Sequence, residues 1–172
     1  MRFGGARLDL SAVPDIIGLS PATLNLLDAA HGDIGCWRLV ENRTSFERVA
    51  REHGNVDGVI WLPGFAPTWW KQSVAQLLRY KPAPAHIACD PDPAGICIAL
   101  EAAGVWEANN LAWSTWKMSL GDLMQLDTRL PLSSHDKVLL EQLLARDLPA
   151  ELRELAHGMQ AHNAKGEQEG YL

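Results

Sequence analysis

The segment at residues 86–100, HIACDPDPAGICIAL, decides how the rest of the chain is interpreted. Its first four residues are mostly apolar, the next four read Asp-Pro-Asp-Pro, and a second apolar run follows Ala94. This pattern predicts a strand, an acidic turn and a helix. Alternate side chains of an extended chain share a face, so Asp90 and Asp92 are expected to point the same way. The two prolines hold both residues out of helical geometry.

Two carboxylates on one side of a strand end repel each other unless a cation lies between them. Hard oxygen ligands in such a place suit Mg²⁺ or Mn²⁺. The alternative is an exposed acidic turn in which Asp92 lies near the N-terminus of the following helix. These residues alone leave both interpretations open.

The segments on either side repeat the strand-then-helix pattern. Strands are predicted at residues 36–40, 59–62 and 86–89, and helices at residues 42–53, 68–80 and 94–104. This alternation predicts an α/β protein with a mostly parallel, doubly wound, Rossmann-like sheet flanked by helices. Glu41, Gly64 and the Asp90/Asp92 pair would then meet at the carboxyl ends of the strands. Taken singly, Glu41 also fits an ordinary helix-terminal carboxylate and Gly64 a plain turn glycine.

The two ends of the chain carry weaker patterns. We expect a short strand at residues 7–10, a helix at 22–30 capped by Ser20, a strand within 109–118, a helix or turn at 119–130, and helices at 131–145 and after Pro149. The polar tail, residues 158–172, is predicted to fray. The expected organisation is an N-terminal strand and helix lead-in at 1–34, an α/β core at 35–125, and a C-terminal helical extension at 126–172 that completes the domain.

Composition limits the class of protein. A chain of 172 residues suffices for one domain with a modest appendage. The formal net charge of −6 does not favour nucleic-acid binding without a local basic patch or a separate binding partner. The cysteines lack CxxC spacing and are expected to be buried thiols. No secretion signal or membrane span is recognisable, which predicts a cytoplasmic protein.

With these motifs placed, the chain resembles the toprim family of topoisomerases, primases and nucleases. The toprim pattern is a Glu after one strand and an Asp-x-Asp after a later one, matched here by Glu41 and by Asp90-Pro91-Asp92. Residues 41–46, 62–65 and 90–95 are more narrowly similar to the C-terminal toprim domain of the JetD (MksG) family. Trp116-Lys117-Met118 and Glu167-Gln168-Glu169 are similar to later motifs of that family.

JetD proteins are nuclease subunits of the Wadjet (SMC-like) plasmid-defence systems and are related to the A subunit of topoisomerase VI. The resemblance therefore implies a metal-dependent endonuclease that hydrolyses phosphodiester bonds of double-stranded plasmid DNA. It also implies SMC-like condensin subunits as partners, a homodimer, and no tyrosine nucleophile. Members usually carry an N-terminal arm and a winged-helix domain, for which 172 residues leave no room. We expect an excised C-terminal piece or a reduced relative.

The same resemblance suggests roles for individual residues. Glu41, Asp90 and Asp92 are the candidate catalytic residues and ligands of Mg²⁺ or Mn²⁺, and Glu41 is alternatively a general base. The closing Glu-Gln-Glu motif suggests Glu169 as a ligand of a second metal ion. Lys71 and Lys117 are candidates for contact with the DNA backbone, although each also fits an ordinary solvated lysine.

Two other functions remain open on the sequence. A primase-like or RNA-processing toprim enzyme would share the acidic residues and differ in substrate. A catalytically incomplete toprim module with an interaction or regulatory role would fit the negative charge and the missing DNA-binding domain. A phosphoacceptor receiver domain is disfavoured because the middle strand ends in Leu62-Pro63-Gly64, without an Asp.

Overall fold

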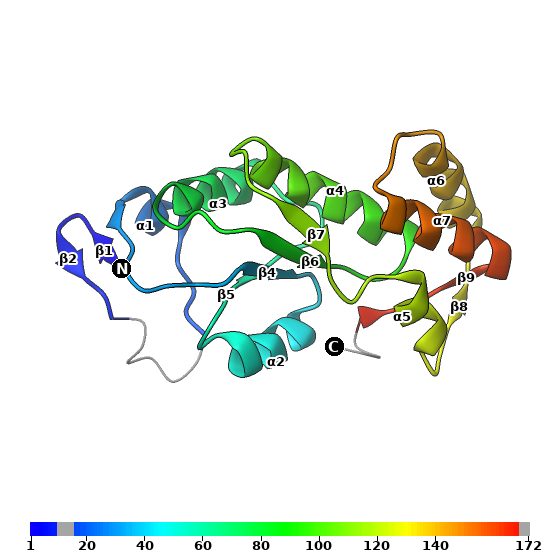
Figure 1. Ribbon diagram of the computed structural model, residues 1–172, viewed down its shortest axis with the longest axis horizontal. Coiled ribbons are helices and arrows are strands. Elements are labelled where there is room, and N and C mark those ends of the chain that lie inside the picture. Colours follow the sequence, from blue (N-terminus) through cyan, green and yellow to red (C-terminus); the bar gives the residue numbers. More distant parts are fainter. Residues whose placement is uncertain (10–15, 169–172) are drawn as a thin grey trace.

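A computed structural model describes residues 1–9 and 16–168 of the chain. Its centre is a parallel sheet of four short strands in the order β5-β4-β6-β7 (Figure 1). The strands are β4 (Trp37–Val40), β5 (Gly58–Trp61), β6 (Ala85–Ala88) and β7 (Trp113–Thr115). The predicted α/β class, with a mostly parallel Rossmann-like sheet flanked by helices, is confirmed.

Helices cover both faces of this sheet. Helix α2 (Arg43–His53) packs on β4 and β5 on one face, while α3 (Thr68–Tyr80) and α4 (Pro93–Glu107) lie together on the other (Figure 1). The capping residue of α2 is Asn42, whose side chain accepts from the N–H of Ser45. Helix α4 continues three residues beyond the expected end at Gly104, because the apolar face of the helix persists through the buried Trp106.

The order of the strands creates a switch point beside β4. The chain passes from β4 through α2 to β5 on one side, then returns through α3 to β6 on the other side. Crossovers that leave in opposite directions open a crevice beyond the carboxyl ends of the two strands, where α/β proteins bind their ligands. Here that crevice lies between β4 and β6, whose last residues, Val40 and Ala88, are register partners.

The core has two parts that follow the alternation of side chains along the strands. Leu39 and Ile87 belong to the large cluster under α3 and α4. Their neighbours Val40 and Ala88 face the other way and pack with Val49 of α2. Because all four side chains are fully buried, the register of β4 against β6 is strongly specified.

The N-terminal region differs from the prediction. The helix expected at residues 22–30 is a short one, α1 (Pro21–Asn25), capped by Ser20 as predicted. It is followed by β3 (Leu27–Ala29), which pairs antiparallel with β1 (Arg2–Phe3), itself paired with β2 (Ala6–Arg7). Helix propensity is overridden because β1 offers main-chain hydrogen bonds at the point where Leu27 becomes buried.

The C-terminal part is more ordered than composition suggested. It consists of α5 (Leu120–Gln125), β8 (Leu130–Pro131), α6 (Ser134–Leu144), α7 (Ala150–His162) and β9 (Ala164–Lys165). The prediction of a fraying tail is wrong for residues 158–168. Gly158 lies against Leu120 of α5, and β9 pairs antiparallel with β8, which turns the chain back toward the sheet. Within the described residues, no helix is long and apolar enough to cross a lipid bilayer.

The close approach of α4 to the turn before it gives a stability test. A Cβ added at Gly95 would lie 2.0 Å from the carbonyl oxygen of Asp90, whereas one added at Gly104 would meet nothing within 4 Å. Gly95→Ala is expected to lower the free energy of unfolding by about 1–3 kcal/mol, because the turn and the helix must separate. Gly104→Ala is expected to raise it by about 0.5–1 kcal/mol. Urea denaturation checks both, and equal stability of the two variants would contradict the packing described.

Candidate metal-binding edge of the sheet

Three acidic side chains meet at the switch point, and we call Glu41, Asp90 and Asp92 together the acidic edge. Glu41 directly follows β4, while Asp90 and Asp92 follow β6. The main-chain N–H of Asp90 donates to Oε2 of Glu41 over 3.2 Å, and the charges of Asp90 and Asp92 both act on the Glu41 carboxyl. The structure thus brings together the three acidic residues singled out in the sequence. Gly64, after β5, adopts a left-handed turn conformation with φ of 65°.

Local backbone chemistry holds two of these carboxylates in place. Asp92 is the capping residue of α4, and its Oδ1 accepts from the N–H of Gly95 over 2.6 Å. Oδ1 of Asp90 accepts from the main-chain N–H of Gln168 over 2.7 Å. Pro93 at the first position of α4 favours this arrangement, because it needs no hydrogen-bond acceptor and is already set for a helix.

The electrostatics of the acidic edge are unfavourable without a cation. Burial, together with the negative charges of Asp90 and Asp92, raises the pKa of Glu41 to about 7. Burial also raises the pKa of Asp92, although the N–H of Gly95 and the charge of Lys165 oppose the effect. Each raised pKa means that the ionised form is disfavoured in the folded protein. A bound cation would reverse this penalty.

A buried thiol lies under the acidic edge. Cys89 is fully buried, and burial, reinforced by the charges of Glu41 and Asp90, raises the pKa of its thiol well above the usual value. The neutral thiol is hydrogen-bonded to Glu41, which lowers the pKa of that carboxyl and partly offsets the burial. The sequence identified Cys89 only as a buried thiol, since nothing in its spacing linked it to Glu41.

The chain returns to the acidic edge near its C-terminus. We call residues 164–168 the C-terminal strap. The N–H of Gly166 donates to the carbonyl of Pro91 over 3.1 Å, and Oε1 of Gln168 accepts from the N–H of Asn42 over 3.0 Å. Gln168 is fully buried, and its Nε2 has no hydrogen-bond partner.

The contacts of the C-terminal strap differ from those expected for the Glu167-Gln168-Glu169 motif. Sequence resemblance drew attention to the acids of Glu167-Gln168-Glu169, yet Gln168 makes the contacts with the acidic edge and Glu167 is exposed. Glu169, the candidate ligand of a second metal ion, lies outside the described residues. Sequence reasoning missed Gln168 because a glutamine is an unusual choice for a buried residue in a polar tail.

The two candidate phosphate-binding lysines lie in different settings. Lys71 on α3 forms an ion pair with Glu101 of α4, which neutralises much of its charge. Lys117 follows β7, is exposed, and has a left-handed backbone with φ of 54°. That conformation is uncommon for residues other than glycine and asparagine, and such outliers gather at functional sites. Its neighbours Trp116, which lies under the Arg38 guanidinium, and the buried Met118 fix the backbone on either side.

Exposed aromatic side chains adjoin the acidic edge on the β5 side. The indole N–H of Trp61 donates to the carbonyl oxygen of Glu41 over 2.9 Å, while 43% of the residue remains exposed. Phe65 and Trp69, in the loop after β5 and the first turn of α3, are also exposed. The Trp61 indole therefore lies against the main chain of Glu41.

The donor set fits a hard divalent cation in its chemistry. Carboxylate oxygens are the preferred ligands of Mg²⁺ and Mn²⁺. Within the described part of the chain, no three His, Cys, Asp or Glu side chains are already arranged around a common point as metal ligands. One oxygen of each carboxylate at the acidic edge accepts from a main-chain N–H instead. Glu41, Asp90 and Asp92 are the residues that would hold the cation.

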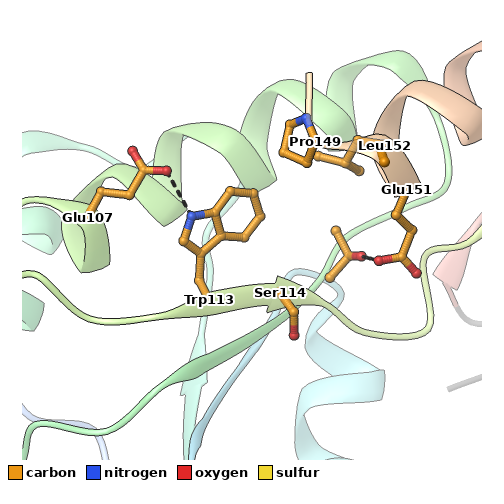
Figure 2. A pocket seen from close by; sticks show the side chains of 8 residues that line it. Glu107, Trp113, Ser114, Pro149, Glu151 and Leu152 are labelled. Carbon is orange, nitrogen blue, oxygen red and sulfur yellow. Dashed lines mark hydrogen bonds between the residues drawn. The ribbon is translucent and has the colours of Figure 1, made fainter. Parts of the chain in front are cut away.

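A separate open recess of about 460 Å³ lies between β7 and the start of α7 (Figure 2). Its two acids are engaged by neighbouring side chains: Glu107 accepts from the indole N–H of Trp113, and Glu151 accepts from the hydroxyl of Thr115. The recess is a weaker candidate site than the acidic edge, because its two carboxylates already accept hydrogen bonds from Trp113 and Thr115.

Comparison with known proteins adds no assignment: no family model matches the chain, and no curated protein matches it.

The raised pKa of Glu41 predicts how stability depends on pH in the presence of a chelator. A carboxyl with a folded-state pKa of about 7, above its ordinary 4.5, favours folding most at low pH, and this advantage is lost as the pH rises through 7. Glu41→Gln removes the ionisation and keeps an oxygen acceptor for the N–H of Asp90. The variant is expected to melt about 2–6 °C above the parent protein at pH 8, and the difference should shrink at pH 5.

The matched control is Glu52→Gln, on the exposed side of α2, which should leave the melting temperature unchanged at either pH. Calorimetry in EDTA at the two pH values gives the comparison. A lower melting temperature for Glu41→Gln at pH 8 would contradict the charge repulsion described above.

Proposed function

We propose that this protein is a divalent-metal-dependent phosphodiesterase that cleaves DNA, with the acidic edge as its catalytic centre. The observation that carries the proposal is the convergence of Glu41, Asp90 and Asp92, from two neighbouring strands, at the switch point of a Rossmann-like sheet. In open α/β sheets this is the position where ligands bind. The raised pKa of Glu41 supports a cation-binding or proton-transferring role.

Each residue of the acidic edge has a chemical task under this proposal. A bound Mg²⁺ or Mn²⁺ would supply charge neutralisation at the scissile phosphate and would favour ionisation of the attacking water. Asp90 and Asp92 would hold the cation. Glu41 would either complete the ligand set of the cation or act as a general base toward that water; its pKa of about 7 is that of the protein without the cation, whose charge would lower it. Lys117 contributes a positive charge for a backbone phosphate.

The resemblance to the JetD (MksG) family extends the proposal to a biological setting. There the protein is a cytoplasmic nuclease of a Wadjet-type system that cuts plasmid DNA with SMC-like condensin subunits as partners. It acts as a homodimer, in line with the preference of soluble oligomers for two-fold symmetry. The exposed Val138 of α6 supplies apolar surface for a second copy. Sedimentation velocity of the purified chain tests this state.

A second candidate is a non-catalytic interaction module. It is favoured by the main-chain hydrogen bonds that each carboxylate already accepts, and by the net charge of −6. A primase-like or RNA-processing enzyme is the alternative within catalysis. RNA cleavage under the same conditions would identify the RNA-processing enzyme, and joining of nucleotides on a DNA template would identify the primase-like one. The experiments below separate these functions.

The first test is nicking of supercoiled plasmid in Mg²⁺ or Mn²⁺. The parent chain is expected to nick the plasmid and Asp90→Asn is expected not to, because the substitution removes the charge that holds the cation. Asn retains an oxygen that accepts from the N–H of Gln168, so the local fold should persist. Asp127→Asn, at an exposed position after α5, is the control and should nick at the parent rate.

Each outcome discriminates between the candidates. Equal nicking by the parent chain and Asp90→Asn would remove the acidic edge from the mechanism. Mn²⁺ binding that requires Asp90, without cleavage of DNA or RNA, would favour the interaction module.

A second test concerns the positive charge at Lys117. Lys117→Gly removes one phosphate contact and suits the left-handed backbone, so binding is expected to weaken without loss of stability. The slope of log K against log salt for double-stranded DNA should fall in magnitude by about 0.9. Lys137→Gly would break α6, so Lys137→Ala, at an exposed position, is the control, and its slope should not change. Fluorescence anisotropy in a salt series measures all three proteins. An unchanged slope for Lys117→Gly would remove this lysine from the DNA-binding surface.

A further inference from the structure

Gln168 is the residue that the catalytic proposal leaves unexplained. It is fully buried, and its Nε2 has no hydrogen-bond partner. Leaving a buried amide donor unpaired costs about 1–3 kcal/mol, so a folded protein rarely keeps one without a reason. No other buried side-chain nitrogen or oxygen in the described residues lacks a partner.

The position of Gln168 is as unusual as its burial. Its main-chain N–H is 2.7 Å from Oδ1 of Asp90, and its Oε1 is 3.0 Å from the N–H of Asn42, the residue after Glu41. One residue thus bridges the carboxyl ends of β4 and β6 across the switch point. The contact with Asp90 is made by the main chain and the contact with Asn42 by the side chain, and an apolar side chain that only filled space could not make the second.

Several contacts hold the C-terminal strap against the acidic edge. A Cβ added at Gly166 would lie 2.1 Å from Leu126 and 3.1 Å from Pro91, so the main chain itself is packed there. Nζ of Lys165 pairs with Asp136 of α6 over 2.9 Å. The pairing of β9 with β8 fixes the approach of the strap. These packing, ion-pair and main-chain contacts therefore hold Gln168 at the acidic edge.

The ion pair between Lys165 and Asp136 persists at neutral pH because Asp136 stays ionised. Burial tends to raise the pKa of Asp136, but hydrogen bonds from Lys165 and Ser133 outweigh it and lower the pKa to about 2. The carboxylate of Asp136 is therefore ionised throughout the neutral range, and Lys165 remains anchored to α6. Ser133 and Asp136 also form the capping box of α6, which ties the strap to a stable helix end.

We propose that Gln168 is a positioning residue of the metal site and that docking of the C-terminal strap is coupled to binding of the divalent cation. This inference depends on the proposed function, since it concerns the same acidic edge. The main-chain N–H of Gln168 fixes the orientation of the Asp90 carboxylate, and its side-chain amide fixes the segment that carries Glu41. Groups that hydrogen-bond to metal-ligating carboxylates orient them in this way.

Coupling of this kind is reciprocal. If the docked strap tightens cation binding by some factor, the cation must stabilise the docked strap by the same factor. The unpaired Nε2 of Gln168 needs a hydrogen-bond acceptor, and a water molecule bound to the cation would supply one. Loss of a group that orients a metal ligand typically weakens metal affinity by about 10- to 100-fold.

The experiment measures Mn²⁺ affinity by titration calorimetry for the full chain and for Gln168→Met. Methionine keeps the length of the side chain and the main-chain contact with Asp90, and it removes the amide. The dissociation constant is expected to rise about 10- to 100-fold. Gln160→Met, at an exposed position on α7, is the matched control and should bind Mn²⁺ as the parent chain does. Asp90→Asn is the control for the metal site itself and should bind no Mn²⁺.

A second readout needs no activity and no change at Gln168. Amide hydrogen exchange of Gln168, followed by nuclear magnetic resonance, is expected to slow on addition of Mg²⁺. In EDTA it is expected to accelerate in Asp90→Ala, which removes the acceptor. Gln168→Met takes away the unpaired buried donor together with the oxygen that accepts from the N–H of Asn42, and its melting temperature in EDTA verifies that it folds.

The outcomes separate this inference from the proposed function. Parent-like Mn²⁺ affinity in Gln168→Met, with binding abolished in Asp90→Asn, would overturn the coupling and leave the metal site intact. Unchanged exchange of Gln168 on addition of Mg²⁺ would also overturn the coupling. Absence of Mn²⁺ binding by the parent chain would overturn both proposals. Unchanged exchange in Asp90→Ala in EDTA would show that the strap does not engage Asp90.

Discussion

The parallel pairing of β4 with β6 is the constraint on which the remaining structure depends. Its register is fixed because the side chains on both faces of the two strands are buried, so a slip of one residue would turn apolar groups out of both clusters. That register places Val40 beside Ala88. Glu41 and Asp90, which follow these strands, must then lie close together even though their negative charges repel each other. The core thus enforces a meeting of like charges that the charges themselves oppose.

The protein compensates for this repulsion with main-chain donors. The N–H of Asp90 serves Glu41, the N–H of Gly95 serves Asp92, and the N–H of Gln168 serves Asp90. These hydrogen bonds moderate the repulsion and do not remove it, since the pKa of Glu41 is still raised to about 7. Under the proposed function, an arrangement of this kind would hold the carboxylates in place ahead of a cation, which is the preorganisation that metal-assisted catalysis requires.

Residues that are not acidic make important contacts with the acidic edge. Gly95 allows the start of α4 to touch the turn that carries Asp90, and Cys89 supplies a neutral hydrogen-bond partner for Glu41 beneath the surface. Gln168 arrives from far along the chain. The chemistry assigned to three acids therefore rests on their neighbours as much as on the acids. The raised pKa of Glu41 in particular is a property of its burial.

The sequence by itself determined the α/β alternation, the bounds of helices such as α3, and the order in which Glu41, Asp90 and Asp92 follow their strands. These features are local: periodic burial, capping residues and prolines act over a few positions. Only the tertiary structure decided that Leu27 joins a strand and that residues 158–168 are packed. It also decided that Gln168 bridges two strand ends. Such outcomes depend on contacts between segments that are distant in the sequence. The local pattern of residues in each segment does not indicate how strong those contacts are.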